Sequence, residues 1–132
     1  MTPFLIIGIV LVGLAALVHV FIFYLESIAW SKPATWKRFG LRSQADADVV
    51  KPMALNQGFY NLFLAVGIAV GIILIVSGQL DVGRALALFG ALSMVAAALV
   101  LVISNAKLAQ AAATQGVLPL LGSIALLVSI AS

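Results

Sequence analysis

Long apolar segments alternate with shorter polar ones along the whole 132-residue chain. The apolar segments cover residues 4–25, 53–76, 82–104 and 117–131. At about 1.5 Å per helical residue, the first of them is roughly 33 Å long, enough to cross the hydrocarbon core of a bilayer. The pattern therefore predicts an all-α fold, an integral membrane four-helix bundle in which residues 1–132 form a single transmembrane domain.

Composition supports this class of protein. Hydrophobic residues make up 64% of the chain and charged residues 8%, whereas soluble domains average about 45–50% and about 25%. A soluble globule of this size could not bury so much apolar surface. Cysteine is absent, which excludes disulfides, thiol catalysis and thiolate metal sites.

The first apolar segment could also be a cleaved signal peptide. It lacks a basic region at its start, its apolar run is long, and His19 and Glu26 stand where a cleavage site would need small residues. We therefore expect a retained helix.

The longest polar segment, residues 27–52, holds five of the seven basic residues, and Trp30 and Trp36 flank its basic part. Indole rings beside cationic side chains are typical of the lipid headgroup level. We therefore expect residues 31–41 to lie along the membrane interface.

Two boundaries rest on local signals. Ser43 followed by Asp46 resembles a capping box, and Pro52 then suits the first turn of a second helix that begins near residue 53. The last apolar segment has only 15 residues, about 22 Å, so we expect it either to take in part of the connector at 105–115 or to end before the far interface.

Charge distribution predicts the topology. The first and third connections carry six of the seven basic residues, and Arg84 alone lies near the opposite face. By the positive-inside rule, residues 27–52 form a long first cytoplasmic loop and both termini lie outside. The basic residues are not interleaved with exposed aromatic ones as a nucleic-acid site would require, so we expect no nucleic-acid partner.

The candidate site consists of polar side chains at one membrane depth. Asn61 lies nine residues past Pro52 and His19 lies seven residues before Glu26, so both lie roughly 10–14 Å inside their helix ends. Part of the second helix presents polar side chains within roughly a 140° arc. We expect a cytoplasm-facing pocket whose ligand-binding candidates are His19, Glu26, Asn56, Gln57, Tyr60 and Asn61.

Each candidate also has a structural interpretation. Asn56, Gln57 and Asn61 could be hydrogen bonds between helices, and Glu26 could be a solvated carboxylate or the partner of Lys51. A single histidine without cysteine is a poor metal ligand set, so we expect no metal and no cofactor. Gly67 and Gly71, on the same arc as the polar residues, predict close helix packing inside the bundle or at a subunit contact.

The residues that carry these features also resemble a known family. The segment His19-Val-Phe-Ile-Phe-Tyr-Leu-Glu26 with Trp30, followed by the block Asn56-Gln-Gly-Phe-Tyr-Asn-Leu-Phe-Leu-Ala-Val-Gly67, resembles domain-of-unknown-function family 1304. The resemblance covers essentially the whole chain. It implies a small bacterial four-helix protein of the cytoplasmic membrane and no particular activity.

Three functions remain open from sequence. The first is an intramembrane pocket for a small amphipathic or lipophilic molecule, with His19 or Glu26 exchanging a proton with it. The second is a small transporter or channel in a homo-oligomer, although no polar ladder runs through the outer half of any helix. The third is a structural accessory protein of the membrane. Whether the chain is an enzyme stays undecided.

Overall fold

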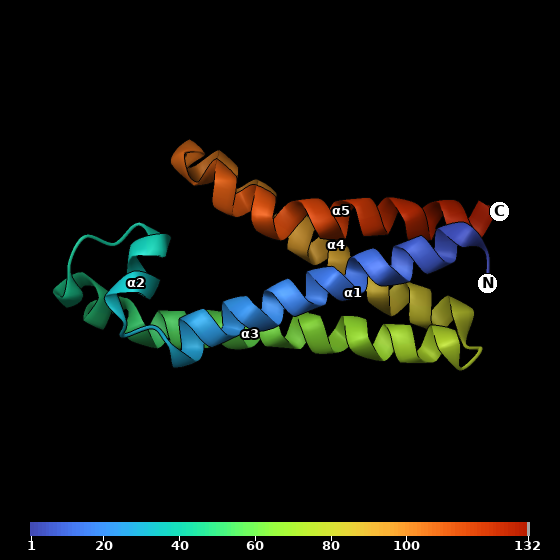
Figure 1. Cartoon of the computed structure of the whole chain (residues 1–132), viewed down its shortest axis with the longest axis horizontal. Helices are drawn as coiled ribbons and strands as arrows, with labels where there is room; N and C mark the ends of the chain where they lie inside the picture. The colour runs from blue at the N-terminus through green and yellow to red at the C-terminus, as the bar shows by residue number, and fades with distance from the viewer. Residues whose placement is uncertain (132) are drawn as a thin grey trace. The chain divides into compact units, whose positions relative to one another are not determined.

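The computed structural model describes residues 1–131, and every regular element within them is a helix. Figure 1 labels the α-helices. In chain order the elements are α1 (Pro3–Phe23), the π-helical turn η1 (Tyr24–Ile28), α2 (Pro33–Trp36), the 3-10 turn η2 (Lys37–Phe39), α3 (Gln44–Val76), α4 (Leu80–Ser104), the 3-10 turn η3 (Ala106–Leu108) and α5 (Ala109–Ala131).

Four stretches of helix are long and apolar enough to span a membrane: Pro3–Ile28, Gln44–Val76, Leu80–Ser104 and Ala106–Ala131. Their lengths are between 25 and 33 residues, whereas about 20 residues suffice to cross the hydrocarbon core. The predicted all-α class, with helices suited to a membrane bundle, is confirmed.

The expected restart of the second helix at Pro52 is wrong. Helix α3 runs without interruption from Gln44, and Pro52 lies inside it. A proline ring leaves the carbonyl four residues earlier, that of Asp48, without its helical partner, and Asp48 is exposed so that water can replace that partner. The start signal at Ser43 is real, because its Oγ accepts a hydrogen bond from the Asp46 amide at 3.1 Å.

The last helix takes in part of the connector, as one of the two sequence interpretations expected. Helix α5 begins at Ala109 and has 23 residues, with Pro119 inside it. Alanine is the strongest helix former, and the alanines of residues 109–113 extend the helix beyond the apolar segment. The third connection is therefore short, with Asn105 in an extended conformation that breaks α4 from η3.

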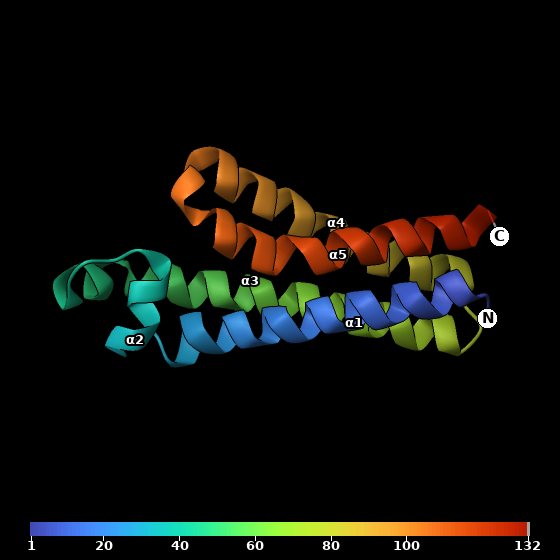
Figure 2. The ribbon, with the colours of Figure 1, turned by 45° about the horizontal axis from the view of Figure 1, so that its top comes forward.

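The chain divides into two compact units. Unit 1 consists of Met1–Val18 and Leu64–Ser132, and unit 2 of His19–Phe63. In unit 1, α4 and α5 lie side by side (Figure 2). Its core draws buried residues from four helices, among them Val12, Ile68, Met94 and Leu126.

Small residues bring the helices of unit 1 into close contact. A Cβ added at Gly71 would lie only 2.8 Å from the backbone nitrogen of Ala87, whereas one added at Gly67 would meet nothing within 4 Å. The close approach of α3 and α4 therefore needs the glycine at position 71. A packing role for Gly67 stays a prediction.

Unit 2 has a small core of its own, formed by Trp30, Trp36, Ala47 and Ala54. The Trp30 indole nitrogen donates to the carbonyl of Ala47 at 2.9 Å, which ties the loop to the first part of α3. Both indole rings are buried against their own chain. The expectation that residues 31–41 lie along the membrane interface stays a prediction.

Candidate functional site

The site begins where α1 ends in the π-helical turn η1. The amide of Ala29 donates to the carbonyl of Tyr24 at 2.8 Å, the five-residue spacing of a π-turn. Lys32 then adopts an extended conformation before Pro33, as residues preceding proline commonly do. The helix therefore ends with Glu26 and Ser27 packed against α3, and the chain turns away after them.

A hydrogen bond between two buried side chains lies at the centre of unit 2. Asn61 Nδ2 donates to Glu26 Oε2 at 2.9 Å, and both residues are only 8% exposed. The same amide group donates to the carbonyl of Gln57 at 3.1 Å, which fixes its orientation. A buried carboxyl needs such a partner, because leaving it unpaired away from water is costly.

Ser27 adds a second link between η1 and α3. Its hydroxyl donates to the carbonyl of Leu55 at 2.9 Å. Gly58 makes this contact possible: a Cβ at that position would collide with Ser27 Oγ and lie 3.1 Å from the Cβ of Glu26. Aromatic contact continues along the helices, with the rings of Phe23 and Phe59 centred 5.1 Å apart.

A cavity of about 360 Å³ lies beside these contacts in unit 2. It is lined by Glu26, Ser27, Ile28, Trp30, Ser31, Lys51, Pro52 and Leu55. The lining combines apolar side chains with two hydroxyls, one carboxyl and one ammonium group. Such a surface suits a molecule that has both an apolar and a polar part.

The structure brings some predicted site residues together and separates others. Glu26 and Asn61 are hydrogen-bonded, and His19 is buried at 2% exposure. Asn56, Gln57 and Tyr60 are exposed in unit 2. The buried face of this part of α3 is formed by residues 54, 58 and 61. Of the predicted polar side chains on α3, only Asn61 belongs to that face.

The partner of Glu26 differs from one of the sequence interpretations. Lys51 lines the same cavity, yet within residues 1–131 no ion pair joins it to Glu26. Asn61 takes that place instead. No group of three or more His, Cys, Asp or Glu residues in residues 1–131 could hold a metal ion.

Sequence reasoning did not select Gly58, Ser27 or Lys51 as site residues. One available signal was the spacing of Ala54 and Gly58, small residues four positions apart that mark a face where another helix approaches closely. Lys51 was named only as a possible partner of Glu26, because its place in the cavity depends on α3 continuing through Pro52.

Comparison with known proteins gives one match. The model of the family described as "Protein of unknown function (DUF1304)" matches residues 13–127. No curated protein and no solved structure matches the chain. The matched range includes the whole of unit 2 and therefore all of the cavity-lining residues.

Proposed function

Since the chain belongs to the DUF1304 family, whose description assigns no activity, we propose a function from the geometry of unit 2. We propose that the chain is an integral membrane protein whose unit 2 cavity binds a small amphipathic or lipophilic molecule. One observation carries the proposal: a cavity with a mixed lining lies directly beside the buried Glu26–Asn61 hydrogen bond.

The size of the cavity supports a small ligand. Its volume of about 360 Å³ falls within the range of about 300–1,000 Å³ that is usual for small-molecule sites. Ile28, Trp30 and Leu55 offer it apolar and aromatic surface. The carboxyl of Glu26 can exchange a proton with a ligand, and Asn61 holds it in place.

The length of α3 supports a position of the cavity near a membrane surface. The helix has 33 residues, and about 20 residues counted back from Val76 fill the hydrocarbon core and end near Gln57. The cavity residues Lys51–Leu55 then lie at headgroup level. A ligand could reach them from the edge of the bilayer, which favours an amphipathic molecule.

We further propose that unit 2 faces the cytoplasm and that the membrane is the bacterial cytoplasmic membrane. Five of the seven basic residues belong to this unit. An excess of Lys and Arg in short loops keeps those loops on the cytoplasmic side. Both termini would then lie outside, and the bilayer itself is the first partner of the chain.

A second candidate function is transport by a homo-oligomer. One observation favours it: Asn56, Gln57 and Tyr60 are exposed side by side along α3. A second copy of the chain covering this polar surface would place the three side chains along a path between subunits. Solute flux into liposomes that depends on these residues tests this function.

Mass spectrometry of the protein purified in mild detergent tests the cavity proposal. We expect a bound small molecule that is lost from Asn61→Ala and from Glu26→Gln, because both changes disturb the buried wall of the cavity. Asn56→Ala is the matched control, since it makes the same substitution at an exposed position of the same helix. Equal retention in Asn61→Ala and the control would refute the proposal, and the same spectra report the number of subunits.

A further inference from the structure

We infer that the ligand of the unit 2 cavity is an anionic amphiphile, whose carboxylate or phosphate head binds Lys51 while its apolar tail lies against Ile28, Trp30 and Leu55. This inference rests on the proposed function, because it names the chemical class of the molecule that the cavity takes.

The first support is the state of the charged groups in the lining. Glu26 is buried and already accepts a hydrogen bond from Asn61. Lys51 is exposed, lines the cavity and has no ion-pair partner within residues 1–131. The cation is therefore the charge that an entering molecule meets first, and it has no internal counter-ion to displace.

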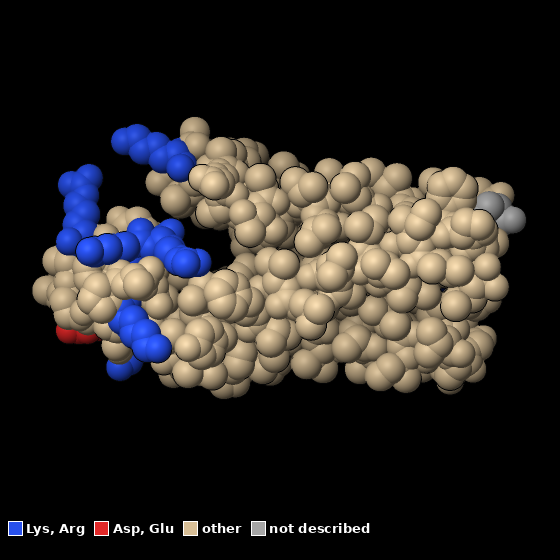
Figure 3. Space-filling view, viewed as in Figure 1, with Lys and Arg blue, Asp and Glu red and all other residues tan. Residues whose placement is uncertain are grey.

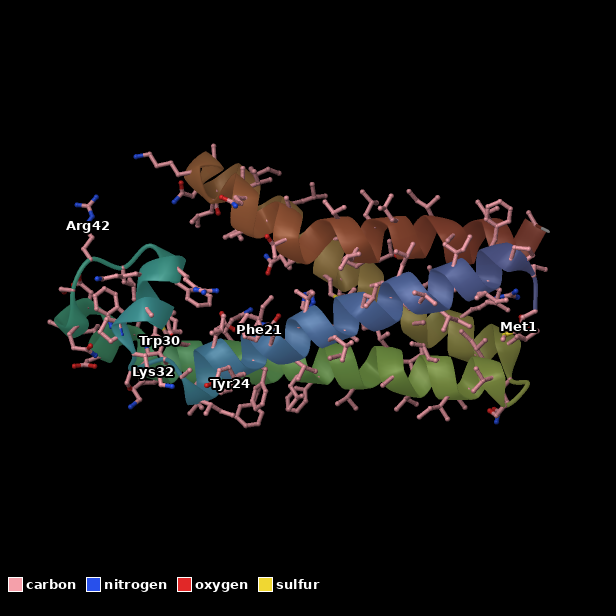
Figure 4. All side chains as sticks on the ribbon, in the orientation of Figure 1. Met1, Phe21, Tyr24, Trp30, Lys32 and Arg42 are labelled. Carbon is pink, nitrogen blue, oxygen red and sulfur yellow. The ribbon has the colours of Figure 1, made fainter. Side chains whose placement is uncertain are left out.

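The second support is the charge of the surrounding surface. Unit 2 exposes Lys32, Lys37, Arg38, Arg42 and Lys51. Figure 3 shows the blue side chains gathered over the loop and short helices of this unit, and Figure 4 shows Arg42 extending away from the ribbon. Its exposed acidic residues are Asp46 and Asp48. Such a surface concentrates anions near the cavity and repels cations from it.

The polar and apolar parts of the lining also fit one orientation of the ligand. Ser31, like Lys51, is exposed, so a hydroxyl and an ammonium group are both available to an anionic head. The Ser27 hydroxyl already donates to Leu55. The head therefore lies at the open side of the cavity, and the tail lies along its apolar and aromatic wall.

An acyl chain with a carboxylate and a phospholipid with an anionic headgroup share this chemistry. A photoreactive dodecanoate with a diazirine in its tail distinguishes them. The protein is placed in nanodiscs of zwitterionic lipid, irradiated with the probe and digested, and the labelled peptides are identified by mass spectrometry. Dodecanoate, dodecyltrimethylammonium and dodecanol then compete for labelling, and in a second set of nanodiscs phosphatidylglycerol replaces part of the lipid.

We expect labelling of peptides from the cavity wall that dodecanoate suppresses and dodecyltrimethylammonium does not. Suppression in the phosphatidylglycerol nanodiscs identifies a phospholipid head as the occupant, and its absence identifies a free amphiphile. Lys51→Gln should weaken competition by dodecanoate about fivefold, the effect of one cation near the headgroups. Lys32→Gln, an exposed lysine outside the lining, should change it less than about twofold because salt screens distant charges.

The outcomes separate the two proposals. Equal competition by all three amphiphiles would overturn the anionic class and leave the binding cavity standing. Absence of labelling in the cavity wall would overturn the anionic class, whereas the proposed function falls only if the purified protein also retains no small molecule that Asn61→Ala loses. Equal effects of Lys51→Gln and Lys32→Gln would show that general surface charge, and not a bound head at Lys51, attracts the probe. Recovery of affinity in Lys51→Arg with an unchanged unfolding midpoint in Lys51→Gln excludes misfolding as the cause.

Discussion

Replacing Gly58 by alanine tests how η1 packs on α3. The new Cβ would collide with Ser27 Oγ and lie 3.1 Å from the Cβ atoms of Glu26 and Ser27. The hydroxyl can escape only by rotating away from the carbonyl of Leu55, to which it donates at 2.9 Å. The substitution therefore removes the hydrogen bond from Ser27 to Leu55 and also crowds the contact between η1 and α3.

The expected change in the free energy of unfolding of Gly58→Ala is the sum of opposing effects. Losing the hydrogen bond costs about 1 kcal/mol, and crowding a packed contact costs about 1–3 kcal/mol. Alanine gains about 1 kcal/mol over glycine inside a helix. Gly58→Ala should therefore lower the free energy of unfolding by about 1–3 kcal/mol. Gly67→Ala is the matched control: its Cβ would meet nothing within 4 Å, so alanine there should leave stability unchanged or raise it slightly.

The assay is unfolding by sodium dodecyl sulfate in mixed micelles, followed by tryptophan fluorescence, because both tryptophans lie in the core of unit 2. The double substitution Gly58→Ala with Ser27→Ala should recover part of the loss, since it removes the oxygen that the new methyl group meets. If Gly58→Ala proves as stable as Gly67→Ala, or if the double variant shows no recovery, the packing described for η1 and α3 is wrong.

Two other substitutions test contacts in each unit. Gly71→Ala should lower the unfolding midpoint by an amount equivalent to about 1–3 kcal/mol, because its Cβ would lie 2.8 Å from the backbone of Ala87. Far-ultraviolet circular dichroism follows this unfolding, since both tryptophans lie in unit 2; a midpoint equal to that of Gly67→Ala would contradict the prediction. Trp30→Phe removes the bond to Ala47 and should cost about 1 kcal/mol; hydrogen exchange should quicken in the loop of unit 2 and stay unchanged in α4, and uniform exchange would argue against an independent core there.

The apolar pattern predicted the number and kind of the helices, because apolar runs of sufficient length have few alternatives in a bilayer. It placed the start of the second helix wrongly for a physical reason. Pro52 lies inside α3, although proline usually marks a boundary. A rule based on local sequence cannot tell whether solvent or neighbouring groups will satisfy the carbonyl that a proline leaves free.

For the candidate site, neither depth nor direction followed from the sequence alone. Counting residues from the helix ends placed His19 and Asn61 at one depth and Glu26 at the helix end, whereas the structure joins Asn61 to Glu26 by a hydrogen bond. The arc of polar side chains on the second helix was too wide to show which of its edges is buried. Asn56 and Tyr60 were therefore expected to point inward, whereas the structure exposes both. The direction depends on the partner helix, whose last turn is a π-turn that the sequence does not signal.

The same local irregularities explain why unit 2 contains a cavity at all. The turn η1 ends at Ile28, and the bond from Trp30 to Ala47 brings the loop back onto α3. Ile28 and Trp30 line the cavity together with Lys51 and Leu55 of α3. The cavity is therefore an incompletely packed part of unit 2 that is lined by the carboxyl group of Glu26 and the ammonium group of Lys51. Such a combination is typical of a binding site.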